Sequence, residues 1–157
     1  MARPSEALAS ALRSTASRLR EGAPFAWGHM GRCNCGHLAQ TLTQRSAAEL
    51  HAAAQARHGD WREQTREYCP TSGLAIDVVL EDLLAAGLSL SDLRHLEDLS
   101  DPAVLARVPA RHLRRSDVRH TIQYLEAWAE LLEDQLQRPR SDGYRLTGRG
   151  EPVSSRA

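Results

Sequence analysis

The chain has 157 residues and a formal net charge of zero, because 20 basic residues balance 20 acidic ones. This length suits a single domain with its own core, and the balanced charge excludes a strong global field that would attract nucleic acid or an acidic membrane. No apolar run approaches the roughly 18 residues that a membrane-spanning helix needs. We therefore expect a cytoplasmic protein with neither a membrane partner nor a nucleic-acid partner.

The first predicted element is an amphipathic helix over residues 5–20. Leu8, Leu12 and Leu19 recur at spacings that place them on one helix face, and Gly22 follows as a stop signal. The next stretch is rich in glycine and cysteine, which disfavours a continuous helix and favours an irregular turn.

Capping signals mark the later helices. Capping-box patterns combine Ser or Asp with Glu three residues later, and Asp before Pro is a strong helix start. The expected helices begin near Asn34, Ser46, Asp60, Thr71 or Ser72, Ser89 or Ser91, Asp101 and Ser116. We expect the segment from 71 to 87, the most apolar one, to be the central helix, and the segment from 116 to 137 to be the longest.

The fold class expected from these patterns is all-α. No run of alternating β-branched residues occurs. We expect a compact single-domain bundle of about six helices over residues 1–137, interrupted by the irregular turn. Residues 138–157 are rich in Arg, Gly and Ser and show no helical period, so we expect them to form a disordered tail.

The glycine-rich turn carries the strongest chemical signal of the sequence. Cys33 and Cys35 lie one residue apart, and His29 and His37 each lie four residues from Cys33. Thiolates and imidazoles are the usual ligands of structural zinc, and three cysteines in a reducing cytosol favour metal or redox chemistry over a disulfide framework. We therefore predict a zinc site formed by Cys33, Cys35 and either histidine, completed by Cys69 if the fold brings that residue close.

Other chemistries use the same residues. The spacing His-x-x-x-Cys-x-Cys over 29–35 resembles the His-x-x-x-Cys-x-x-Cys of zinc-binding anti-sigma factors, with one residue fewer. CDGSH-type iron–sulfur proteins also use three cysteines and one histidine with a Cys-x-Cys start, so an iron–sulfur cluster is the alternative cofactor. Cys33 and Cys35 could instead form a disulfide that Cys69 attacks or resolves. Cys69 precedes a proline and is a weak haem-ligand candidate. Finally, free cysteines can simply be buried core residues.

Three further residues are reserve candidates for the same site. Asp77 and Glu81 lie four apart on the expected central helix and could supply a general base or a fifth ligand, although a solvated helix face explains them equally well. Trp27 could form a wall that shields a cofactor from water. His51, by contrast, is assigned no role.

The function expected from the sequence is that of a small metal-binding protein with a structural or regulatory role, which binds another protein. The alternative is a thiol-based or iron–sulfur redox protein or sensor that uses the same cluster. No established catalytic motif is present. Whether the chain is an enzyme is left open.

Overall fold

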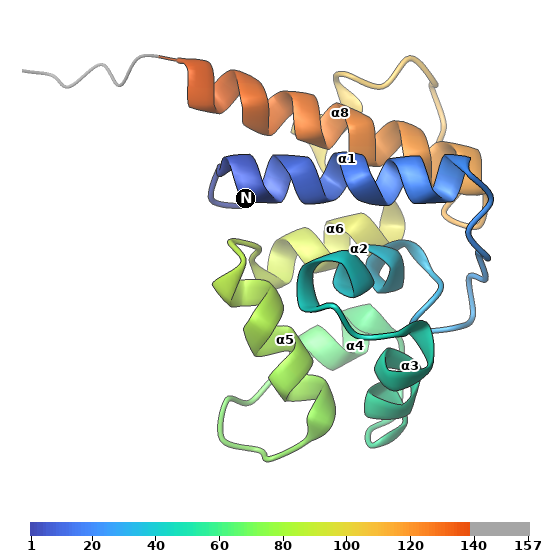
Figure 1. The fold of residues 1–157 in the computed structure, drawn as a ribbon, viewed down its shortest axis with the longest axis vertical. Coiled ribbons are helices and arrows are strands. Elements are labelled where there is room, and N and C mark those ends of the chain that lie inside the picture. Colours follow the sequence, from blue (N-terminus) through green and yellow to red (C-terminus); the bar gives the residue numbers. More distant parts are fainter. Residues whose placement is uncertain (139–157) are drawn as a thin grey trace, which may run out of the picture.

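The computed structural model describes residues 1–138, which form eight helices and no strand (Figure 1). The all-α prediction is therefore confirmed for this part of the chain. The helices are α1 (Glu6–Arg20), α2 (Asn34–Thr43), α3 (Ala47–Gln55), α4 (Trp61–Arg66), α5 (Ala75–Ala85), α6 (Leu90–Asp98), α7 (Pro102–Leu105) and α8 (Val118–Gln137). Apart from Arg138, the tail predicted for 138–157 lies outside the described residues.

Eight helices are present in this part of the chain rather than about six, and two of them, with predicted starts at Asp60 and Asp101, are very short. Helix α4 has six residues and α7 has four, lengths that are marginal for an isolated helix in water. Each begins at a strong cap. Asp60 forms a full capping box with Glu63, and the Asp101 side chain accepts hydrogen bonds from the first turn of α7. A good cap contributes about 1 kcal/mol, which favours a helix start even in so short a segment.

Three predicted helix starts are wrong in detail. Helix α8 is capped by Asp117 rather than by Ser116. Asn34 is not the N-cap of α2, since Cys33 holds that position and makes no side-chain cap. Helix α5 begins at Ala75 rather than at Thr71 or Ser72. The Ser72 hydroxyl accepts a hydrogen bond from the Leu74 amide at 3.0 Å, a local turn that competes with helix formation.

The helices form two groups, with α2 between them. Helices α1 and α8 lie side by side and antiparallel, and α3, α4 and α5 lie on the other side of α2 (Figure 1). Helix α2 contacts α1, α3, α5 and α6, and its first six residues are all buried. The central helix is therefore α2, and not the more apolar α5 that the sequence favours.

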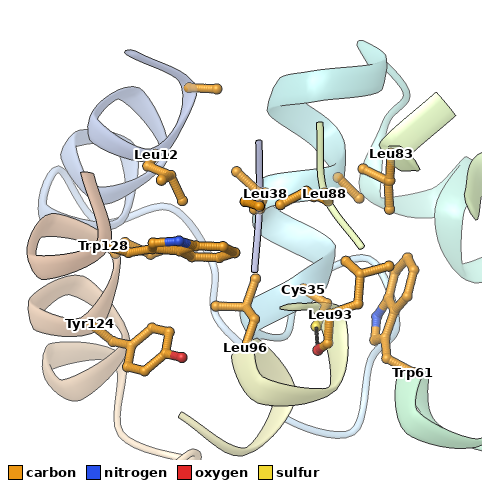
Figure 2. Close-up of a cluster of buried hydrophobic side chains, with 14 of the residues drawn as sticks. Leu12, Cys35, Leu38, Trp61, Leu83, Leu88, Leu93, Leu96, Tyr124 and Trp128 are labelled. Atoms are coloured by element: carbon orange, nitrogen blue, oxygen red, sulfur yellow. Dashed lines mark hydrogen bonds between the residues drawn. The ribbon is translucent and has the colours of Figure 1, made fainter. Parts of the chain in front are cut away.

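A continuous hydrophobic core joins the two groups. Trp128 projects from α8 toward Leu38 and Leu96, and Leu12 of α1 lies near its ring (Figure 2). Each of these side chains is almost completely buried, and burial of one such side chain stabilises the fold by roughly 1.5–3 kcal/mol. Among the described residues, no helix is both long enough and apolar enough to cross a membrane.

Candidate functional site

The two cysteines of the turn are core residues. Cys33 is 1% exposed and Cys35 is 0% exposed. The Cys35 thiol donates a hydrogen bond to the Leu93 carbonyl at 3.2 Å, drawn in Figure 2. Burial, and secondarily the charge of Glu97, raises the pKa of Cys33 to about 12 and the pKa of Cys35 well above its usual value. Both groups are therefore protonated thiols at neutral pH, as the buried-cysteine interpretation predicts.

Cys69 lies apart from them. It is an exposed free cysteine in the turn between α4 and α5, with its sulfur 3.5 Å from the Thr71 hydroxyl. Hydrogen bonds from the Thr71 side chain and backbone lower its pKa. The fold therefore does not bring Cys69 beside Cys33 and Cys35.

The two histidines point to different neighbours. The His37 ring is buried, donates a hydrogen bond from Nε2 to the Pro24 carbonyl at 3.1 Å, and stacks on Phe25. The His29 ring stacks instead on His51, with ring centroids 4.0 Å apart. Within residues 1–138, no three His, Cys, Asp or Glu side chains are grouped so that they could hold a metal ion. Zinc, an iron–sulfur cluster and haem stay predictions that this geometry does not support.

The reserve acids also lie apart from the cysteines. Asp77 is buried and forms a two-point ion pair with Arg57, with Oδ1–Nη2 and Oδ2–Nη1 distances of 3.0 and 3.1 Å. The Ser72 hydroxyl donates a further hydrogen bond to it. Glu81 is exposed on the same helix. Asp77 therefore anchors α5 to the segment that follows α3, which is a structural task.

The third reserve residue, Trp27, leads to a polar pocket. This pocket has a volume of about 280 Å³ and lies where the turn before α2 meets α3, α6 and the loops that precede α4 and α8. The side chains that give it its chemical character are Trp27, Met30, His51, Asp60, Glu97 and Arg115. Part of the predicted segment therefore lines the pocket, while its two cysteines lie in the core.

Close backbone contacts hold the turn in place. A Cβ atom on Gly36 would lie 2.3 Å from the Met30 carbonyl oxygen, so only glycine permits this approach. The Trp61 indole donates a hydrogen bond to the same carbonyl at 3.0 Å, and the Met30 amide donates one to His51 Nδ1 at 3.3 Å. The main chain of Met30 thus connects α2, α3 and α4 at the edge of the pocket.

Glu97 is the most unusual residue of the pocket. It is only 2% exposed, and its Oε2 atom has no hydrogen-bond partner among the described residues. Burial raises its pKa to about 7, an effect that interaction with the Cys35 thiol opposes and the charges of Asp60 and Asp98 reinforce. This carboxyl group therefore changes its charge near neutral pH.

Among the described charged groups in and beside the pocket, some form ion pairs and others do not. Arg115 donates a hydrogen bond to Asp98 at 2.8 Å, and its guanidinium carbon lies 4.6 Å from the centre of the Trp27 ring. Asp98 also pairs with Arg62. Asp60 accepts a hydrogen bond from the Glu63 amide at 3.0 Å through Oδ1. Neither Asp60 nor Glu97 forms an ion pair with any residue in 1–138.

His51 contributes a polar ring with a defined tautomer. Its Nδ1 accepts the Met30 amide proton, so the neutral ring carries its own proton on Nε2. Its ring neighbour His29 has a lowered pKa, because burial and then the nearby charges of His51 and Arg32 disfavour the imidazolium. With Nδ1 occupied as an acceptor, His51 can offer its Nε2 proton as a donor, whereas Asp60 and Glu97 present acceptors.

The pocket residues come from segments that are far apart in the sequence, so no local motif marks them. One signal does point to Glu97. It lies four residues after Leu93 and one after Leu96 on α6, which places a carboxyl group on the apolar face of an amphipathic helix. For His51, Asp60 and Arg115 we find no comparable signal in the sequence.

No protein-family model matches this chain, and no curated protein or solved structure is significantly similar to it.

Proposed function

We propose that the chain is a binding protein for a small polar molecule, which enters the pocket beside Trp27. The observation that carries this proposal is the Glu97 carboxyl group, which is buried in the pocket wall and has an oxygen without a partner. A buried polar atom that lacks a hydrogen bond costs about 1–3 kcal/mol. A ligand that donates a hydrogen bond to Oε2 would recover that free energy.

The composition of the pocket supports the same proposal. Ligand pockets combine apolar or aromatic walls with a few polar groups that fix orientation. Here Trp27 and Met30 supply the apolar surface, and His51, Asp60 and Glu97 supply donors and acceptors. A titratable group with a strongly raised pKa in such a pocket is a further indication of a functional site.

Metal binding by the cysteines is the weaker proposal. It would require two buried thiols to ionise and the exposed Cys69 to move to them. Redox chemistry at Cys33 and Cys35 meets the same obstacle, because oxidants react with exposed thiolates far faster than with buried thiols.

Affinity selection from a metabolite extract tests the binding proposal. The protein would be incubated with the extract, separated from free small molecules by gel filtration, and analysed by mass spectrometry. Gln55 lines the pocket and is exposed near the end of α3, so Gln55→Trp should obstruct the entrance. Ala48 is exposed on the same helix outside this pocket, so Ala48→Trp is the matched control.

The proposal predicts a compound that the wild type and Ala48→Trp retain and that Gln55→Trp loses. Retention of no compound, or equal retention by all three proteins, would contradict it. Circular dichroism of both variants would show that each keeps its helical fold.

A further inference from the structure

We propose that the ligand of this pocket is a small organic cation, with an ammonium, amidinium or guanidinium group that binds between Asp60 and Glu97. This inference rests on the proposed function, because it names the chemical class of the molecule that the pocket takes. It follows from the balance of charge in the pocket and from the acceptor atoms that have no hydrogen-bond partner among the described residues.

The two pocket carboxyl groups have no ion-pair partner in the described part of the chain, and the charge of Arg115 compensates Glu97 only in part. Arg115 is the arginine of the pocket wall, and it is already paired with Asp98 at 2.8 Å. Asp60 and Glu97 have no basic partner among residues 1–138. Asp60 also raises the pKa of Glu97, so the two groups are close enough to repel each other. A cation would remove this repulsion, whereas an anion would add to it.

The available atoms are acceptors for a ligand with several donors. Glu97 Oε2 has no partner, and Asp60 uses Oδ1 to cap α4, which leaves Oδ2 for a ligand. Ammonium, amidinium and guanidinium groups carry several N–H donors and no acceptor, so they match two carboxylates.

Trp27 favours the same class of ligand. An aromatic face attracts cations that lie within about 6 Å of its centre. The position of the Arg115 guanidinium, 4.6 Å from the ring centre, shows that this indole already accepts a planar cation. An amidinium that bound to the carboxylates would lie in a pocket whose wall includes this indole.

Binding of a cation is coupled to the ionisation of Glu97. The groups around this carboxyl group are Cys33, Cys35, His51, Asp60, Asp98 and Arg115. The pKa of Glu97 is about 7 in the free protein, and a bound cation favours its ionised form. The affinity for a cation should therefore rise about tenfold between pH 6 and pH 8 as the free carboxyl group loses its proton.

The test is an NMR titration with matched compounds. Benzamidinium and methylguanidinium are the cations, benzamide and methylurea are their neutral counterparts, and benzoate is the anion. The indole resonance of Trp27 reports occupancy of the pocket. Glu97→Gln keeps the shape of the side chain and removes its charge, and Glu81→Gln does the same at an exposed position outside the pocket.

We expect saturable shifts with both cations, at least tenfold weaker binding of the neutral compounds and of benzoate, and tighter binding of the cations at pH 8 than at pH 6. Glu97→Gln should weaken the preference for cations, because Asp60 remains, and should remove the tenfold rise in affinity between pH 6 and pH 8, while Glu81→Gln should change neither. If the pH dependence of cation affinity arose from histidine titration alone, it would be the same in Glu97→Gln and in the wild type. That result would overturn the proposal.

The two proposals fail in different ways. If benzamide, methylurea or benzoate binds as tightly as the cations and Gln55→Trp abolishes that binding, the pocket is a ligand site but its ligand is not a cation. If none of the five compounds shifts the Trp27 resonance, the cation proposal is overturned, and selection from the metabolite extract decides the binding proposal separately.

Discussion

At the scale of single residues, the fold buries the Glu97 carboxyl group in surroundings that disfavour its ionised form. Its pKa is raised from 4.5 to about 7, so the folded protein binds this proton more tightly than the unfolded chain does. The stabilisation is complete below about pH 4.5 and is lost as the pH rises to about 7. Ionised Glu97 is therefore a cost that the fold carries above neutral pH.

This cost predicts the pH dependence of stability. Between pH 4.5 and pH 8, Glu97 should lower the free energy of unfolding by about 3 kcal/mol, and Glu97→Gln should remove that decrease. Urea unfolding of the wild type and of Glu97→Gln at pH 5 and pH 8 measures this decrease in the free energy of unfolding. The histidines contribute equally in both proteins, so their contribution cancels when the two decreases are subtracted. An equal pH dependence in both would show that Glu97 titrates normally.

The cysteines differ in accessibility, which predicts their reactivity. Only Cys69 is exposed, while Cys33 and Cys35 are buried, protonated thiols. A chromogenic disulfide reagent should therefore modify one thiol rapidly in the folded protein and all three in denaturant. Cys69→Ser should abolish the rapid phase and change stability by less than about 0.5 kcal/mol. A marked loss of stability in Cys69→Ser would instead favour a metal site that includes this residue.

At the scale of elements, local chemistry sets most helix starts. Ser46, Asp60 and Ser89 form capping boxes that are visible in the sequence, because a cap needs only residues that are close along the chain. Asn34 is also of a residue type that favours the N-cap position, but it serves another purpose. Its side-chain amide donates to the Leu96 and Glu97 carbonyls at 3.3 and 3.1 Å and accepts from Thr121 at 2.7 Å. Tertiary contacts override the local signal there.

The close contact at Gly36 predicts that Gly36→Ala destabilises the protein, whereas helix propensity alone would predict stabilisation. Within a helix, Gly→Ala normally stabilises by about 1 kcal/mol. In α2, however, the new Cβ would lie 2.3 Å from the Met30 carbonyl, and the turn would have to shift. Gly36→Ala should therefore lower the free energy of unfolding by about 2 kcal/mol or more.

Gly28 is the matched control, since an added Cβ there would have no neighbour within 4 Å. Gly28→Ala should change stability by less than about 0.5 kcal/mol. Thermal and urea unfolding would compare the two variants. Stabilisation by Gly36→Ala would mean that the turn does not pack on α2 as closely as described.

At the scale of the whole molecule, the fold class was predictable and the site was not. Helical periodicity, caps and the absence of strand patterns are local properties, and together they led to the all-α prediction. Residues two apart on a helix point about 200° away from each other. Cys35 and His37 accordingly face α6 and Pro24, respectively. Closeness in sequence therefore did not produce a ligand cluster.

The pocket, by contrast, assembles residues that no short motif connects. Trp27, His51, Asp60, Glu97 and Arg115 come from five separate segments. Only the packing of α3 and α6 on α2, and of α4 on α6, brings them together. A single sequence does not specify that packing. Within the predicted site, Trp27 alone belongs to this pocket as a lining side chain.

The most direct test of the central claim is the titration of the Glu97 carboxyl carbon by NMR, without and with saturating benzamidinium. We predict a midpoint near pH 7 in the free protein, and a decrease of at least about one pH unit with the cation, which would favour the ionised form. A midpoint near the ordinary value of 4.5 in the free protein, or a midpoint that the cation leaves unchanged, would contradict the account.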